Sequence, residues 1–261
     1  MPTWKLTIEY EGTRYRGWQE QINAKTVQDA IKSAAMNLFE GPVELMGGGR
    51  TDAGVHAIAQ TAHLKGKKFL KPHEILYGLN DRLPADINIL DVRTVTAEFH
   101  ARHSAVARAY LYQISTRRTA FGKPFVWWVK DPLDVKRMTQ AAALFEGRHN
   151  FASFCDVDTS TGEKAKSTIT EVKISRIETS GDLILYRIVA SHFLWKMVRR
   201  VTGVLVEAGR GNVTERDIKR LLQHPTRDAA PWTAPPSGLF LEKILYQGDS
   251  LPEEIRPAPR L

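Results

Sequence analysis

Apolar and polar residues alternate along the first half of the chain in a pattern that predicts strands separated by amphipathic helices. Strict alternation over residues 4–10 predicts a half-buried strand. Apolar residues at helical spacing predict a helix over 27–38, with Thr26 as its N-cap. Further strands are predicted at 42–46, 60–64 and 87–92, and Pro72 starts a second helix. The predicted order is βαββαβ.

The second half of the chain repeats this order. Strands are predicted at 107–115, 168–177, 183–190 and 239–246, and helices at 133–145, from Phe193 to about Ala208, and after Thr214. The expected fold class is α+β, with two ferredoxin-like units whose sheets join in one core. Helices are expected on one face, and an active-site cleft between the halves. The predicted domains are residues 1–103 and 104–261.

Composition narrows the class of protein. The chain has 261 residues, of which 43% are apolar and 25% charged, which is typical of a globular protein and excludes disordered and collagen-like chains. The 37 Lys and Arg residues exceed the 29 Asp and Glu residues, giving a net charge of +8. Positive charge favours polyanionic partners, although an accident of composition explains +8 equally well.

Two absences in the sequence concern the compartment of the protein. Cys155 is the single cysteine, so the fold does not depend on an intramolecular disulfide. No apolar segment approaches the roughly 20 residues of a membrane-spanning helix, and the N-terminus does not resemble a signal peptide. We therefore expect a soluble, cytoplasmic protein without a membrane partner.

A glycine-rich segment, Gly47 to His56, is the first candidate for chemistry. It lacks the Gly-Lys-Ser/Thr end of a phosphate-binding loop, and Asp52 occupies the place of the third glycine of a dinucleotide motif. Glycines allow backbone and substrate to approach closely, so the segment could present Arg50 and Asp52 together. The alternative is a glycine-rich turn with a surface ion pair, and spacing alone does not separate the two.

Two further patterns combine positive charge with aromatic or helical spacing. Arg108, Tyr110 and Tyr112 share one face of a predicted strand, a face suited to stacking on a base and contacting a phosphate. A solvated sheet face is the commoner meaning of such alternation. Lys196, Arg199 and Arg200 form a cationic strip on a predicted helix, where a solvated polar face is again the default. The alternative is that Arg199 is aimed at a carboxylate such as Asp52.

The sequence contains none of the common metal or nucleophile motifs. There is no Cys-x-x-Cys, no His-Glu-x-x-His and no Gly-x-Ser-x-Gly. His56 and His192 are interpreted as structural histidines. We expect neither a metal site nor a cofactor.

The segment Gly47–Ala57, Gly-Gly-Gly-Arg-Thr-Asp-Ala-Gly-Val-His-Ala, resembles the signature of the tRNA pseudouridine synthase A family. Other family-like motifs follow in the expected succession over nearly the whole chain: 8–13, 17–19, 26–28, 99–105, the Arg-x-Tyr-x-Tyr strand, 147–154, 193–200 and 238–239. The chain departs from the family in three places: Gly48 replaces a common alanine, Arg200 stands where many members have asparagine, and Trp195-Lys196 is a less usual pair ahead of Met197.

The resemblance implies an enzyme that isomerises uridine to pseudouridine in the anticodon arm of tRNA, at positions 38, 39 or 40, as a homodimer without metal or cofactor. It implies that Asp52 is the essential aspartate and Tyr110 the active-site tyrosine. Arg50 would help to displace the target base, and Arg199 would pair with the aspartate. Leu239 would form an apolar wall beneath the uracil.

Additional contacts are expected around this set. Thr51 and His56 are expected to bind substrate, and RNA contacts are expected from Arg14, Trp18, Arg102, Arg108 and Lys196. Asp52 could attack C6 of uracil or act at the ribose, and the sequence leaves both open. Rival interpretations are a non-catalytic RNA-binding protein or chaperone, and an enzyme acting on a small phosphorylated substrate.

Overall fold

The computed structural model describes residues 1–156 and 167–258, and the chain forms two compact units. Unit 1 comprises residues 1–106 together with 240–250. Unit 2 comprises residues 107–239 together with the C-terminal residues from 251. The sequence-based division at 103/104 differs from this in two respects: the boundary lies at 106/107, and residues 240–250 group with the first unit.

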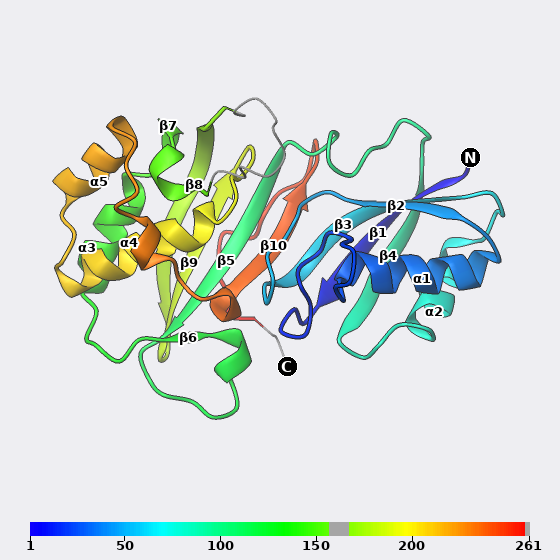
Figure 1. The fold of residues 1–261 in the computed structure, drawn as a ribbon, viewed down its shortest axis with the longest axis horizontal. Helices are drawn as coiled ribbons and strands as arrows, with labels where there is room; N and C mark the ends of the chain where they lie inside the picture. Colours follow the sequence, from blue (N-terminus) through cyan, green and yellow to red (C-terminus); the bar gives the residue numbers. More distant parts are fainter. Residues whose placement is uncertain (157–166, 259–261) are drawn as a thin grey trace. The chain divides into compact units, whose positions relative to one another are not determined.

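Unit 1 has the predicted βαββαβ order (Figure 1). Its elements are β1 (Thr3–Tyr10), α1 (Val27–Phe39), β2 (Val43–Gly47), β3 (His56–Gly66), α2 (Pro72–Asn80), β4 (Ile87–Val95) and the late strand β10 (Leu239–Leu245). β1 lies between β4 and β3, antiparallel to both. β2 pairs with residues 62–66 of β3, and β10 runs parallel to β3 at residues 56–57. The start of β3 is thereby held by a strand from the far end of the chain.

The core of unit 1 follows from the alternation in β1. Trp4, Leu6 and Ile8 are fully buried, and the Trp4 ring meets Phe39 of α1 edge-on at 5.4 Å. Each such side chain stabilises the fold by about 1.5–3 kcal/mol through removal of apolar surface from water. The N-cap prediction is confirmed, since the Thr26 hydroxyl accepts a hydrogen bond from the backbone N–H of Asp29.

Unit 2 is also a sheet with helices. Its elements are β5 (Ala107–Ser115), β6 (Trp127–Trp128), α3 (Val135–Ala143), β7 (Gly147–Asn150), β8 (Ile169–Ser180), β9 (Leu183–Ala190), α4 (Met197–Arg210) and α5 (Glu215–Gln223). β5, β9, β8 and β7 lie side by side as antiparallel neighbours, and β6 runs parallel to β5. β6 and β7 were not predicted, because two and four residues are too short to show alternation.

The start of α4 corrects the sequence-based prediction. The helix begins at Met197, four residues after Phe193, because Lys196 adopts a left-handed conformation with φ of 63°. The predicted cationic strip does not form either. Arg200 is only 6% exposed, and its guanidinium and the Lys196 ammonium both bind the carboxylate of Asp156. A helix buried on most of its surface requires an arginine inside the protein to be paired.

Candidate active site

Asp52 lies in the loop between β2 and β3, and the backbone on both sides of it is tied down. The carbonyl of Thr51 accepts a hydrogen bond from the Trp18 N–H at 3.1 Å, and the Gly54 N–H donates to the Tyr15 carbonyl at 3.2 Å. Asp52 itself is half-buried, and its carbonyl accepts from the Val55 N–H at 3.1 Å. The loop therefore holds a partly exposed carboxylate on a fixed backbone.

The glycine-rich start of this loop is anchored to the body of β3. The Gly48 N–H donates to the Thr61 carbonyl at 2.7 Å, and the Gln60 amide donates to the Gly49 carbonyl at 2.8 Å. Arg50 is exposed, and its Nε donates to Oε1 of Gln19 at 3.1 Å. A guanidinium thus stands at the surface two residues before the carboxylate.

Thr51 and His56, which the sequence assigns to substrate binding, are both buried. The Thr51 hydroxyl shares a 2.8 Å hydrogen bond with the phenol of Tyr10, whose pKa is raised by burial so that it stays neutral. His56 is 1% exposed; its Nδ1 accepts from the Gly12 N–H at 3.0 Å, and its ring stacks on Phe240 at 4.8 Å. In this structure both side chains fix the aspartate loop in place.

The turn after β1 approaches the aspartate loop so closely that only glycine fits at two positions. A Cβ on Gly12 would lie 1.9 Å from the Val55 carbonyl oxygen. A Cβ on Gly17 would lie 2.5 Å from the Thr51 carbonyl oxygen, and Gly17 also has φ of +96°, a conformation that side chains disfavour. The glycines of this turn therefore support the position of Asp52.

The RNA contacts expected from unit 1 differ in accessibility. Trp18 is 1% exposed and packs on Gly47, whose Cβ position lies 2.5 Å from the indole, so this ring is part of the core and offers no surface to RNA. Arg14 and Arg102 are exposed. The loop that carries Arg102 is ordered by two histidines, because Nδ1 of His63 accepts from the Ala101 N–H and Nδ1 of His100 from the Arg102 N–H.

In unit 2, the Arg-x-Tyr-x-Tyr strand is β5, and its side chains are more buried than a solvated face would be. Tyr110 is 7% exposed and packs edge-on against Phe193 at 4.9 Å. Tyr112 is fully buried, and its hydroxyl donates to the Pro235 carbonyl at 2.8 Å. Burial raises the pKa of Tyr112 well above its usual value. Tyr112 is therefore a core residue, and the prediction of two stacking tyrosines holds at most for Tyr110.

Arg199 of α4 contacts the segment between α5 and β10, and Leu239 is the first residue of β10. The Arg199 Nε donates to the Ala234 carbonyl at 2.7 Å, and the Ala234 N–H donates back to the Arg199 carbonyl at 3.1 Å. This exchange fixes the stem of a half-buried arginine. Leu239 is 4% exposed and starts β10. Arg108 on β5 donates through its Nη1 to the Ser191 carbonyl at 3.0 Å.

Residues that support the site escaped the sequence-based predictions. Asp156 binds Lys196 and Arg200 at the start of α4, and its backbone N–H donates to the Trp195 carbonyl at 3.1 Å. The partners are about 40 residues apart in the chain. No local spacing rule indicates such a pairing, since only the fold brings these groups together. Gln60 escaped prediction for the same reason.

The described ranges contain neither a metal-ligand cluster nor a membrane-spanning helix. Among residues 1–156 and 167–258, no group of three or more His, Cys, Asp or Glu side chains is placed to hold a metal ion. In the same part of the chain, no helix combines the length and the apolar character needed to cross a bilayer.

The chain is similar to a known protein family and to several named proteins over most of its length. A family model described as tRNA pseudouridine synthase matches residues 6–104 and 141–247. A protein of Agrobacterium fabrum called tRNA pseudouridine synthase A is 37% identical over 262 residues, covering 98% of this chain and 97% of its own. Proteins of the same name from Myxococcus xanthus and Sinorhizobium fredii are each 39% identical, over 95% and 94% of this chain and 93% and 100% of theirs.

Proposed function

The chain belongs to the tRNA pseudouridine synthase family, and we propose that Asp52 is the carboxylate on which its isomerisation of uridine in tRNA depends. The observation that carries this proposal is the construction of the aspartate loop. The hydrogen bonds to Thr51, to Gly54 and within the loop fix the backbone around Asp52, yet its own side chain stays partly open. A fixed group at the point of reaction reduces the entropic part of the barrier.

The reaction moves a bond within one nucleotide. The bond from N1 of uracil to C1′ of ribose breaks, the base turns, and C5 bonds to C1′; C5 then loses its proton and N1 carries one. Atoms and electrons balance without an oxidant or reductant. An ionised carboxylate serves this sequence as a nucleophile or as the charge that stabilises an electron-poor ribose.

The remaining predicted site residues take roles that fit their environments. Arg50 is exposed and cationic, which suits a group that replaces the target base when it leaves the stack, a step that costs a few kcal/mol. Arg199, fixed through Ala234, would keep the aspartate ionised. Tyr110 is held edge-on by Phe193, so its ring plane is set for stacking on uracil. Leu239 would supply apolar contact.

Three finer points belong to the same proposal. We place the target in the anticodon arm, at positions 38, 39 or 40, and the enzyme in the cytoplasm as a homodimer. The net charge of +8 supports a polyanionic substrate such as tRNA. Mapping pseudouridine in tRNA treated with the protein gives the position, and light scattering gives the number of subunits.

Replacement of the carboxylate tests the central proposal. Asp52→Asn preserves volume and removes the charge, so tRNA binding at low salt should persist while tritium release from C5-labelled uridine stops. Asp91→Asn is the matched control, because Asp91 lies on β4 of the same unit and pairs with Arg93 at the surface. Turnover by Asp52→Asn would overturn the proposal. Absence of turnover by the unmodified protein would favour a non-catalytic RNA-binding role.

A further inference from the structure

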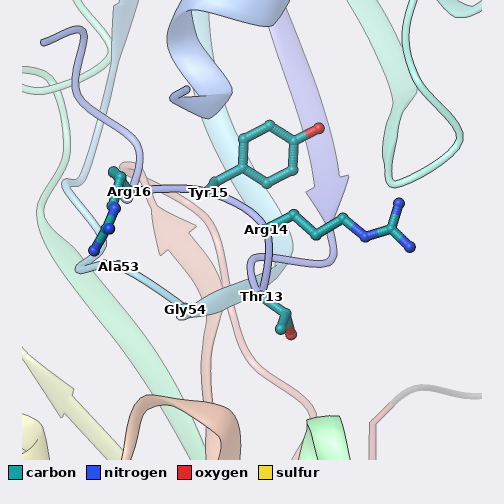
Figure 2. Close-up of a pocket in the computed structure, with 6 residues that line it drawn as sticks. All are labelled: Thr13, Arg14, Tyr15, Arg16, Ala53 and Gly54. Carbon is teal, nitrogen blue, oxygen red and sulfur yellow. The ribbon is translucent and has the colours of Figure 1, made fainter. Parts of the chain in front are cut away.

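The turn that follows β1 forms a hollow together with the aspartate loop (Figure 2). Its volume is about 430 Å³, and it is lined by Thr13, Arg14, Tyr15, Arg16, Ala53 and Gly54. Ala53 and Gly54 directly follow Asp52 in the chain. A molecule in this hollow therefore lies against the backbone of the loop to which we assign the chemistry.

Two guanidinium groups of the hollow have no partner among the residues that the structure describes. Arg14 and Arg16 are exposed, and neither guanidinium forms an ion pair or hydrogen bond with any residue in 1–156 or 167–258. Arg82 and Arg93 of the same unit, by contrast, bind Asn37 and Asp91. Figure 2 shows the two side chains leaving the turn in different directions.

Other charged groups lie near the turn. Lys25 is exposed and lies over the Tyr15 ring at 4.6 Å. Of the nearby carboxylates, Asp86 accepts a 2.5 Å hydrogen bond from the Tyr15 hydroxyl, and Glu11 accepts from the Thr13 N–H at 2.9 Å. Asp86 and Glu11 are thus already engaged in local hydrogen bonds, and Asp52 is the carboxylate to which we assign the chemistry.

The backbone that carries the two arginines is rigid. Tyr15, between them, is 2% exposed, and its hydroxyl and carbonyl are both bonded, to Asp86 and to the Gly54 N–H. The Arg16 N–H donates to the Lys25 carbonyl at 2.9 Å. A turn anchored on both sides presents its charges at fixed positions, which reduces the entropy lost when a ligand binds.

We propose that this hollow is a phosphate subsite, in which Arg14 and Arg16 bind backbone phosphates of the RNA strand next to the target uridine. The guanidinium fork matches the geometry of phosphate oxygens and prefers them to neutral ligands. A hollow of about 430 Å³ accommodates a nucleotide as well as its phosphate. The inference rests on the proposed function and adds Arg16 to the predicted RNA contacts.

Paired substitutions in protein and RNA test the subsite. The variants are Arg14→Gln, Arg16→Gln, the double variant and the conservative double lysine variant; Arg93→Gln is the control, because it removes a paired arginine from the same unit. The RNA is an anticodon stem-loop in which methylphosphonates replace single phosphates on either side of the target. Binding constants are measured over a range of salt concentrations.

We expect the double glutamine variant to bind more weakly and to lower the slope of log K against log salt by about 1–2, since each lost phosphate contact removes close to one unit. The lysine variant should recover most of that slope. One or two methylphosphonates should weaken binding by the unmodified protein several-fold and leave the double variant unaffected. Arg93→Gln should behave as the unmodified protein.

Two results would overturn the inference. The first is an unchanged salt slope in the double glutamine variant. The second is that this variant binds more weakly, yet every methylphosphonate that weakens binding by the unmodified protein also weakens binding by the variant. Thermal unfolding of each variant separates these outcomes from misfolding. The binding measurements do not require turnover. Failure of the proposed isomerisation would therefore appear in the tritium assay alone, and failure of the phosphate subsite in the binding assay alone.

Discussion

Gly17→Ala provides a direct test of whether the turn after β1 positions the aspartate. Gly17 has φ of +96°, and its carbonyl accepts a hydrogen bond from the Val27 N–H at the start of α1. A methyl group placed there would lie 2.5 Å from the Thr51 carbonyl oxygen and 3.2 Å from the Asp52 carbonyl carbon. Both contacts are with backbone, so either the turn or the aspartate loop has to move.

Two costs add in this variant. An alanine held in the left-handed region costs about 1–2 kcal/mol, and overpacking against a fixed backbone costs roughly a further 1–3 kcal/mol. At roughly 2–4 °C per kcal/mol for a chain near this length, the left-handed conformation alone lowers the melting temperature by about 2–8 °C. The overpacking displaces the loop, and misplacement of a reacting group by about 1 Å costs on the order of 100-fold in rate.

Gly181→Ala is the matched control. Gly181 also has positive φ, of 56°, but its Cβ position has nothing within 4 Å, in the turn between β8 and β9. Single-turnover tritium release and thermal unfolding should be measured for both variants. Gly181→Ala should lose stability and keep its rate within about twofold, whereas Gly17→Ala should lose at least about tenfold in rate. Equal rates in the two variants would refute the positioning role of the turn.

Two further predictions concern α4. Burial opposes ionisation of Asp156, but the hydrogen bond from Lys196 and the charge of Arg200 outweigh it and lower the pKa of this carboxyl. Its ionised form therefore stabilises the fold above the unfolded pKa of about 3.9, and the contribution disappears as pH falls through the lower folded pKa. Denaturant titrations should show Asp156→Asn less stable than the unmodified protein at pH 7 and the gap closing in acid; a gap independent of pH would contradict this. Gly203→Ala should disrupt the fold, because its Cβ would lie 1.5 Å from the Trp232 carbonyl oxygen. Circular dichroism should show a loss of the folded signal, and a native spectrum with an unchanged melting temperature would contradict this packing.

The regular elements were predictable where alternation was long enough to show. The eight residues of β1 and the thirteen of α1 carry clear periods, and Thr26 marks a helix start by local hydrogen bonding. The start of α4 was not predictable. The left-handed Lys196 stops the helix from extending back to Phe193, and its ammonium binds Asp156, a tertiary contact that leaves no periodic signal nearby.

The candidate site likewise has a part that the sequence predicts and a part that it does not. The segment 47–57 resembles a family signature and draws attention to Asp52, to which we assign the chemistry, because its residues are adjacent in the chain. The groups that fix its backbone come from elsewhere: Trp18 and Tyr15 from the turn after β1, and Gln60 from β3. Aromatic and imidazole side chains near a signature are easily interpreted as ligand contacts. Burial shows that Trp18 and His56 instead hold the loop.

The aspartate loop is held through backbone groups at Thr51, Gly54 and Gly48 and through the side chains of Thr51 and His56. The partners that set the position are a turn and a strand whose residues touch no reacting atom. Substitutions at Gly12 or Gly17 should therefore lower the rate of the chemical step while tRNA affinity, which depends on exposed cations such as Arg14 and Arg16, stays near its original value. Substitution of Arg14 or Arg16 in the same turn should have the opposite effect, lowering tRNA affinity without lowering the rate of the chemical step. The single segment 12–17 thus separates binding from positioning by which of its groups face outward.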